Sequence, residues 1–232
     1  MNDFSALLNG FRGAIFDFDG TLVDSMPDWS RKMLWQLDEA GIAYPSDIIR
    51  RITPMGDRRA AEYFRTLGLK KSTEEILNGM RAYATDAYHH RIVCKPRVPE
   101  LLALLRDRGV RMCILTASPR DMVLPCLARN GIADSFSFVW CCDDLGMSKT
   151  QPEIYRKTAA ELGIPLENCR FFDDNLSALR TAHEAGLMTV GVADASAAGD
   201  REAIVNTVDF MCDCYNGLIS YLSDCENIPK II

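Results

Sequence analysis

The chain has no long apolar run and no cluster of basic residues. Its 232 residues carry 26 Lys and Arg against 32 Asp and Glu, a formal net charge of −6. The longest stretch without Asp, Glu, Lys or Arg is ten residues, 214–223, whereas a membrane-spanning helix needs roughly 20 apolar residues. Phosphate contacts with nucleic acid need a basic face. We therefore expect no membrane span and no nucleic-acid partner.

Secretion signals and zinc motifs are also missing. Residues 1–12 lack a basic start and a sustained apolar segment, so they do not resemble a secretory signal, and we expect a cytoplasmic protein. The nine cysteines are an odd number, and a chain of this length can form a core without disulfides. Neither Cys141-Cys142 nor the pair Cys212 and Cys214 has a second pair at zinc-site spacing. We expect reduced thiols, most of them buried.

What the chain does contain is an alternation of short apolar runs and helical patterns. The runs have strand length and lie at 13–17, 110–115, 136–141, 170–172 and 188–192. Helical spacing occurs at 98–108, 120–130, 152–162 and 176–185. Four of these patterns end at a glycine, which suits a helix C-cap. The alternation predicts an α/β fold with a doubly wound parallel sheet.

Residues 25–92 interrupt this alternation. They contain helical patterns at 29–37, 60–67 and 76–88 and no convincing strand. Connections between a strand and a helix usually take roughly 2 to 6 residues, so an insertion of 68 residues predicts a small domain of its own. We expect residues 1–24 and 93–232 to form the α/β core domain and residues 25–92 to form a helical domain.

Polar residues follow the predicted strands, where ligands bind in parallel sheets. They are Asp17 and Asp19 after the first strand, Thr116 and Ser118 after the second, Lys149 after the third, and Asp173-Asp174-Asn175 after the fourth. Two carboxylates about 4 Å apart repel by roughly 4 kcal/mol at an effective dielectric of 20. A group of aspartates therefore predicts a cation, and Mg²⁺ is the natural one for oxygen ligands.

The other polar residues suit phosphate chemistry. Lys149 offers a positive charge for a phosphoryl group. Thr116 stands at a strand end, and Ser118-Pro119 leads into a helix, whose N-terminal N–H groups bind anions. Asp17 and Asp19 are two positions apart, so one can attack phosphorus while the other exchanges protons with the leaving group. Taken singly, each of these residues has a commoner structural role, and their joint placement favours a catalytic one.

At this point the sequence resembles the haloacid dehalogenase superfamily. The string Phe16-Asp17-Phe18-Asp19-Gly20-Thr21-Leu22-Val23-Asp24-Ser25 is similar to its first motif and Ile114-Leu115-Thr116-Ala117-Ser118 to its second. Lys149 with Pro152 and Tyr155 resembles the third motif, and Phe171-Phe172-Asp173-Asp174 resembles the fourth. The resemblance spans nearly the whole chain, and it implies a Rossmann-like core with a helical cap domain inserted after the first strand.

The resemblance also implies roles for individual residues. Asp17 would form an aspartyl-phosphate, with Asp19 as general acid and then general base. The phosphate would be bound by Gly20, Thr116, Ala117, Ser118 and Lys149. Mg²⁺ would be held by Asp17, Asp173, Asp174 and the backbone carbonyl of Asp19. This sequence departs from the family pattern at Thr150-Gln151 and at Asn175, without losing a charged catalytic group.

The insertion is expected to select the substrate. Residues 53–59 are expected to form a loop over the crevice, and Arg58 or Arg59 could bind a second anionic group of the substrate. Lys32 is a weak candidate for the imine-forming lysine of a phosphonate hydrolase. Dehalogenation is disfavoured because the dehalogenases of the family lack the second aspartate of the first motif.

Our expectation is therefore a Mg²⁺-dependent phosphatase that acts on a small-molecule phosphomonoester. A sugar-phosphate mutase similar to β-phosphoglucomutase is the alternative, because it would use the same four motifs. A phospho-aspartate receiver is disfavoured by the order of the motifs and by the insertion. Neither the identity of the phosphorylated substrate nor the choice between phosphatase and mutase follows from the motifs.

Overall fold

The computed structural model describes residues 5–224, which fall into two compact units. Residues up to Asp24 and from Val93 onward form one unit, and Ser25–Ile92 form the other. The first unit contains, in order, α1 (Ser5–Leu8), β1 (Gly13–Phe16), α6 (Val98–Asp107), β2 (Arg111–Thr116), α7 (Arg120–Arg129), η2 (Ala133–Ser135), β3 (Val139–Cys141), α8 (Cys142–Leu145), α9 (Pro152–Leu162), η3 (Leu166–Asn168), β4 (Cys169–Asp173), α10 (Leu176–Glu184), β5 (Met188–Val192), η4 (Ala195–Asp200), α11 (Arg201–Val205), β6 (Phe210–Cys212) and α12 (Tyr215–Asp224).

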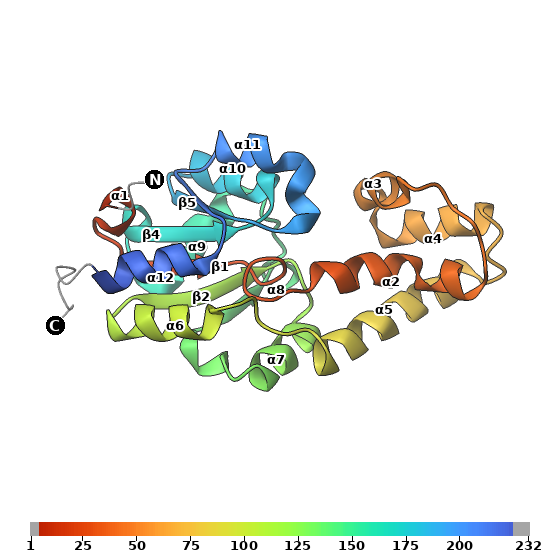
Figure 1. Ribbon diagram of the computed structural model, residues 1–232, viewed down its shortest axis with the longest axis horizontal. Coiled ribbons are helices and arrows are strands. Elements are labelled where there is room, and N and C mark those ends of the chain that lie inside the picture. Colours follow the sequence, from red (N-terminus) through yellow and green to blue (C-terminus); the bar gives the residue numbers. More distant parts are fainter. Residues whose placement is uncertain (1–4, 225–232) are drawn as a thin grey trace. The chain divides into compact units, whose positions relative to one another are not determined.

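The strands of this unit form one parallel sheet in the order β3-β2-β1-β4-β5-β6 (Figure 1). β1 lies at the centre, where Ile15 pairs with Cys113 of β2 on one side and Phe171 of β4 on the other. Every residue of β1 and β4 is buried, as expected for strands covered on both faces. The predicted α/β fold with a parallel sheet is confirmed.

Alternate side chains of the central strands pack on the two faces of the sheet, each of which is covered by helices. Ile15, Leu115 and Phe171 pack in one cluster with residues of α9 and α10. Phe16 stacks on Phe172, with ring centres 4.6 Å apart, and its neighbouring position in the strand turns it to the other face. α6 contacts β2 and α12. Helices thus cover both faces, which is the doubly wound arrangement.

The sequence predicted most but not all of these elements. α9 begins at Pro152 and ends at Leu162, and the capping residue Gly163 has a φ of 70°, the left-handed conformation expected there. The third strand is shorter than predicted, because residues 136–138 precede β3 instead of belonging to it. β6 was missed, since its three residues are too few to show a pattern. The helices α1, α8, α11 and α12 were also not predicted.

The second unit is helical throughout its regular structure. It consists of α2 (Met26–Glu39), α3 (Ile48–Ile52), η1 (Thr53–Met55), α4 (Gly56–Thr66) and α5 (Thr73–His90). Its own core includes Leu37, Ile52 and Phe64. α5 starts with a capping box in which Ser72 and Glu75 exchange hydrogen bonds. The loop predicted at residues 53–59 is wrong, because η1 and the first turn of α4 occupy it, and both proline and glycine are tolerated in the opening turn of a helix.

Membrane spans and disulfides are absent from the part of the chain that the structure describes. Within residues 5–224, no helix is both long enough and apolar enough to cross a bilayer. The eight cysteines of this range are all free, and all except Cys94 and Cys214 are buried. Most of these thiols are thus buried, as predicted, while the ninth cysteine lies outside the described residues.

Candidate functional site

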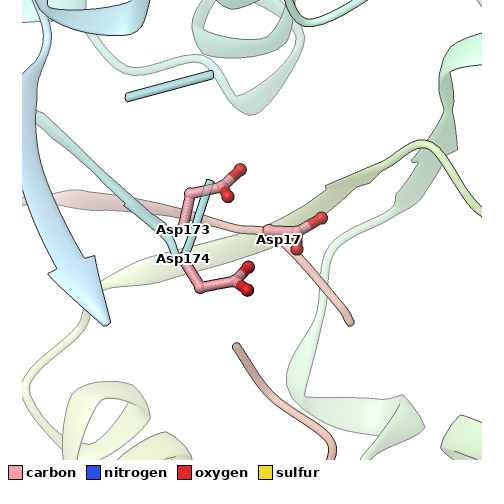
Figure 2. Close-up of side chains that lie close together, drawn as sticks. All are labelled: Asp17, Asp173 and Asp174. Atoms are coloured by element: carbon pink, nitrogen blue, oxygen red, sulfur yellow. The ribbon is translucent and has the colours of Figure 1, made fainter. Parts of the chain in front are cut away.

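Three aspartates meet at the carboxyl ends of the two central strands. Asp17 directly follows β1, Asp173 ends β4, and Asp174 comes next in the chain. Because β1 and β4 are neighbours, the backbone N–H of Asp17 donates to the carbonyl of Phe172 at 2.8 Å. One carboxylate oxygen from each aspartate lies within 4.8 Å of the others, and all three residues are buried (Figure 2). The pairing of the strands therefore builds the predicted acidic cluster.

Lys149 joins two of these carboxylates. Its Nζ donates to Asp17 Oδ1 and, at 2.8 Å, to Asp173 Oδ2. The lysine lies between α8 and α9, and its carbonyl accepts a hydrogen bond from the hydroxyl of Tyr155 at 2.8 Å. Tyr155 is fully buried in α9, so the helix fixes the segment that carries Lys149. The structure thus brings Lys149 to Asp17.

The two adjacent aspartates of β4 have different surroundings. Asp173 accepts from Lys149 through one oxygen and from the backbone N–H of Asn175, at 2.7 Å, through the other. Asn175 in turn caps α10 by accepting from the N–H groups of Ser177 and Ala178. Among the residues that the structure describes, no N–H or O–H group donates to the Asp174 carboxylate. Asp174 therefore has free oxygen lone pairs for a cation.

Burial controls the charge of this cluster. It raises the pKa of Asp17 well above the ordinary value; Lys149 opposes this shift, and the neighbouring aspartates add to it. Burial and the charge of Asp173 raise the pKa of Asp174 to about 7. Burial disfavours the charge of Lys149, yet Asp17 and Asp173 outweigh it and raise the pKa of the lysine. One ammonium does not neutralise three buried carboxylates, which is the electrostatic demand that a divalent cation meets.

Gly20 shapes the turn that faces Asp174. Its φ is +72°, and a Cβ atom placed there would lie 2.5 Å from Asp174 Oδ2. The turn is closed by hydrogen bonds from the N–H groups of Leu22 and Val23 to the carbonyl of Phe18, at 2.9 and 3.1 Å. Both the backbone conformation and the close approach of the carboxylate require glycine. Gly20, one of the residues predicted to bind phosphate, therefore lies against the acidic cluster.

Asp19 faces the turn that follows β2. Ser118 Oγ donates to Asp19 Oδ2, and the backbone N–H of Ser118 donates to Thr116 Oγ1 at 3.0 Å. Thr116 and Ser118 are buried, Ala117 is exposed, and Asp19 is half-buried. The structure thus places Asp19 beside the predicted phosphate-binding turn. Its side chain is not one of the three clustered carboxylates, and the metal role of its backbone carbonyl stays a prediction.

Two predicted residues lie in the helical unit. Arg58 stands in the first turn of α4 and forms an exposed ion pair with Glu74, with 2.8 Å between Nη2 and Oε1. Its role in substrate binding stays a prediction. The Lys32 side chain is buried, 3.0 Å from Asp57 and 3.7 Å from the ring centre of Trp29. Its amine is held in an ion pair, an arrangement that does not favour an imine-forming lysine.

Sequence reasoning missed an ion pair next to the site. Lys95 Nζ lies 2.8 Å from Asp194 Oδ2, and both side chains are largely buried. Asp194 follows β5, so the rule that located the other strand-end residues could have identified it. Lys95 had no such signal, because it precedes α6 and follows no strand. Tyr215 was also missed, although its hydroxyl donates to the carbonyl of Thr21 at 3.0 Å.

Comparisons with known proteins agree with this geometry. A family model described as haloacid dehalogenase-like hydrolase matches residues 11–186. Hexitol phosphatase B of Escherichia coli O157:H7 is 27% identical over 201 residues, covering 84% of this chain and 89% of its own. A phosphoglycolate phosphatase of Pectobacterium atrosepticum is 28% identical over 198 residues, covering 81% and 82%.

A solved structure shows the same fold. The β-phosphoglucomutase of Clostridium difficile superimposes with a TM-score of 0.70 at 17% identity, covering 92% of this chain and 96% of its own. The four motifs, the parallel sheet that brings them together, and a family match over most of the chain lead to one conclusion. The chain belongs to the haloacid dehalogenase-like hydrolase family.

Proposed function

We propose that the chain is a Mg²⁺-dependent phosphatase that hydrolyses a small phosphomonoester through a covalent aspartyl-phosphate on Asp17. One observation carries the proposal: Lys149 binds the Asp17 carboxylate inside a buried group of three aspartates. An ammonium in this position suits a nucleophile that attacks an anionic phosphoryl group, because it offsets the repulsion between the two.

The named relatives support this substrate class. They include a hexitol phosphatase and a phosphoglycolate phosphatase, each matched over more than four-fifths of this chain. Their names describe phosphate esters of a polyol and of a small hydroxy acid. We therefore propose a small sugar-like or hydroxy-acid phosphate as substrate.

The residues at the site fit a magnesium ion. Mg²⁺ binds one or two carboxylates directly and keeps other positions for water and phosphate. Asp174 has no hydrogen-bond donor among the described residues, and Gly20 leaves room beside its carboxylate. Asp17, Asp174 and the carbonyl of Asp19 would hold the ion, with Asp173 fixed next to them by Lys149. When bound, the ion would neutralise the carboxylates and draw charge from the phosphoryl oxygens.

In the first step Asp17 acts as the nucleophile. One of its carboxylate oxygens forms a bond to phosphorus, and the bond between phosphorus and the ester oxygen breaks. Asp19 gives its proton to the departing alkoxide, which leaves as the alcohol. Lys149 and the hydroxyl of Thr116 offset the charge on the phosphoryl oxygens. The products of this step are the alcohol and phosphorylated Asp17.

In the second step Asp19 acts as a base. It takes a proton from a water molecule, whose oxygen attacks the phosphorus of phosphorylated Asp17. The bond between phosphorus and the Asp17 oxygen breaks, which releases inorganic phosphate and restores the carboxylate. The contact between Ser118 Oγ and Asp19 supports this role, because it holds the acid/base residue next to the phosphate-binding turn.

The helical unit is proposed to act as a cap. A domain inserted directly after the nucleophile strand can close over the substrate, exclude water and select the leaving group. Arg58, at the start of α4, is proposed to bind a second anionic group, which would require it to exchange its exposed partner Glu74 for the substrate. Exposed pairs of this kind are weak, so the exchange costs little.

The mutase alternative has less support. The similarity to solved structures named as β-phosphoglucomutases lies at 17 and 22% identity and concerns the fold, whereas the curated relatives named above are phosphatases. The free cysteines of residues 5–224 are typical of a reducing compartment and support a cytoplasmic location.

The direct test is phosphate release from p-nitrophenyl phosphate and from a panel of polyol, sugar and hydroxy-acid phosphates, with Mg²⁺ or with EDTA. We expect turnover only with Mg²⁺. Asp17→Asn should lose at least about a thousandfold in kcat, because it removes the nucleophile. Asp19→Asn should lose about a hundred- to ten-thousandfold with alkyl phosphates. With the aryl phosphate, Asp19→Asn should slow the first step less than with alkyl phosphates, because p-nitrophenolate departs without a proton.

Asp143→Asn is the matched control, since Asp143 is an exposed aspartate of α8, and it should keep wild-type activity. Full activity of Asp17→Asn would refute the proposed nucleophile. Interconversion of hexose phosphates by the wild type, with no phosphate release, would replace the phosphatase by the mutase.

A further inference from the structure

Hydrogen bonds to neighbouring residues hold an ion pair that lies outside the acidic cluster. Lys95 Nζ lies 2.8 Å from Asp194 Oδ2, and the two side chains are 13% and 6% exposed. The same ammonium donates to the carbonyl of Ala193 at 2.9 Å. Asp194 Oδ1 accepts from both the N–H and the hydroxyl of Ser196, at 2.8 and 2.6 Å. Neither charge can turn to solvent without breaking these bonds.

The pair stands beside the proposed metal site. β5 pairs with β4 so that Asp173 lies opposite Gly191, and Asp194 follows β5 at the same edge of the sheet. The backbone N–H of Lys95 donates to the carbonyl of Leu22 at 2.9 Å, within the turn that presses Gly20 against Asp174. The pair therefore joins the turn that contains Gly20 to the end of β5, the strand next to the one that carries the aspartates.

The electrostatics agree with this position. After burial and Asp173, which raise the pKa of Asp174, Asp194 raises it further and Lys95 lowers it. The two partners thus act on the same carboxylate with opposite signs. Each of the two charges shifts the pKa of Asp174, and in the intact pair the two shifts oppose each other.

We propose that Lys95 and Asp194 are a charge-balancing pair that sets the affinity of the acidic cluster for its cation by acting through Asp174. The inference rests on the proposed metal site. A lone ammonium at this place would repel a divalent cation, and a lone carboxylate would attract it. Held together, they keep the turn and the end of β5 in place without adding a net charge next to the cluster.

The proposal has a signature that a purely structural role lacks: the two single variants must act in opposite directions. Lys95→Met keeps the apolar stem and leaves the Asp194 charge, so it should tighten cation binding about three- to tenfold. Asp194→Asn keeps the shape and leaves the Lys95 charge, so it should weaken binding about three- to tenfold. The double variant, with no charge at either position, should bind within about twofold of wild type.

The measurement is cation affinity without substrate. Mn²⁺ serves as the probe, with free Mn²⁺ followed by electron paramagnetic resonance at one fixed pH of about 8 for all variants. Competition by Mg²⁺ gives the affinity for that ion. Because the effects are electrostatic, both single-variant shifts should shrink when the salt concentration rises from about 0.05 to 0.5 M. Circular dichroism checks that each variant is folded, and Lys95→Gln replaces Lys95→Met if the latter does not fold.

Weaker binding in both single variants, or no change in either, would overturn the proposal. Asp17→Asn identifies the ion that is titrated. It should weaken the binding of Mn²⁺ strongly, and unchanged binding would place the ion elsewhere and also overturn the proposal. Absence of phosphate release by the wild-type protein would instead count against the proposed phosphatase activity. The binding experiment does not depend on that activity.

Discussion

Gly20 is the residue on which the geometry of the acidic cluster depends most directly. We predict that Gly20→Ala weakens Mg²⁺ binding and phosphate release at least about tenfold, because the new Cβ would lie 2.5 Å from Asp174 Oδ2 at a φ of +72°. The carboxylate would have to move away from the position that faces Asp17. Cation affinity and kcat, measured on the same preparation, check this.

Gly41→Ala is the matched control for this prediction. Gly41 has a φ of +65°, and a Cβ there would meet no atom within 4 Å. The control should lose about 1 kcal/mol of stability from backbone strain and keep cation binding and activity. Equal effects of the two variants on cation binding would show that the contact with Asp174 is unimportant.

The polar residues of the site could be identified from the sequence more readily than the contacts between them. Asp17, Thr116 and Asp173 could be identified because each stands at the end of a short apolar run, and parallel strands bring such ends to one edge. The bond between Ser118 and Asp19 could not be predicted, since it depends on side-chain rotamers in two separate turns. The same holds for the pair of Lys95 and Asp194, which joins a segment before α6 to the end of β5.

At the scale of elements, α2 and α5 are joined by a buried amide. Gln36 is 2% exposed, and its Nε2 donates to the carbonyl of Ile76 at 2.9 Å. Gly79 of α5 leaves the space for this amide, because a Cβ at that position would lie 2.7 Å from Gln36 Nε2. The glycine therefore has a packing role inside a helix, where it would otherwise be unfavourable.

We predict that Gly79→Ala lowers the free energy of unfolding by about 1 kcal/mol, although alanine is the better helix former. The lost hydrogen bond of Gln36 outweighs the gain in propensity. Gly217→Ala is the comparison, because Gly217 lies in α12 with no atom within 4 Å of the added Cβ, and it should be more stable than wild type by about 0.5 to 1 kcal/mol. Urea unfolding of both variants checks the difference in sign. Stabilisation by both would contradict the packing role of Gly79.

The elements that the sequence predicted are those with enough residues to display a period. β1, β2 and β5 are apolar runs of four to six residues, and they were found within one residue of their ends. β6, with three residues, and α3, with five, are too short for a period to stand out. The segment 53–59 shows no apolar period, and the structure places η1 and the first turn of α4 there instead of the predicted loop.

For the whole molecule, the raised pKa of Asp174, at about 7, couples stability to pH and to the metal. The unfolded carboxyl has a pKa of about 3.9. Between these values the folded protein binds more protons than the unfolded one, so without metal its stability should fall as the pH rises from about 4 to 7. Asp17, whose pKa is also raised, contributes in the same direction.

Magnesium should reverse this trend, because it binds the ionised carboxylates. We predict that the melting temperature in EDTA falls with rising pH and that the gain from added Mg²⁺ grows from about pH 5 to about pH 8. An ion at about 100 times its Kd adds about 2.7 kcal/mol to the free energy of unfolding, or about 5 to 10 °C for a chain of this size. Asp174→Asn should flatten the fall in EDTA and reduce the gain. A gain that is independent of pH would contradict the assignment of the site.

The central claim is that Asp17 becomes phosphorylated, and Asp19→Asn gives the most direct measurement of it. This variant keeps the nucleophile and lacks the base for the second step, and p-nitrophenolate needs no acid to depart. We predict a burst of one p-nitrophenolate per active site with Mg²⁺. After an acid quench, mass spectrometry should find one phosphoryl group on the peptide that contains Asp17, and hydroxylamine should remove it. Steady phosphate release by this variant at the wild-type rate, or a phosphoryl group on another residue, would contradict the account.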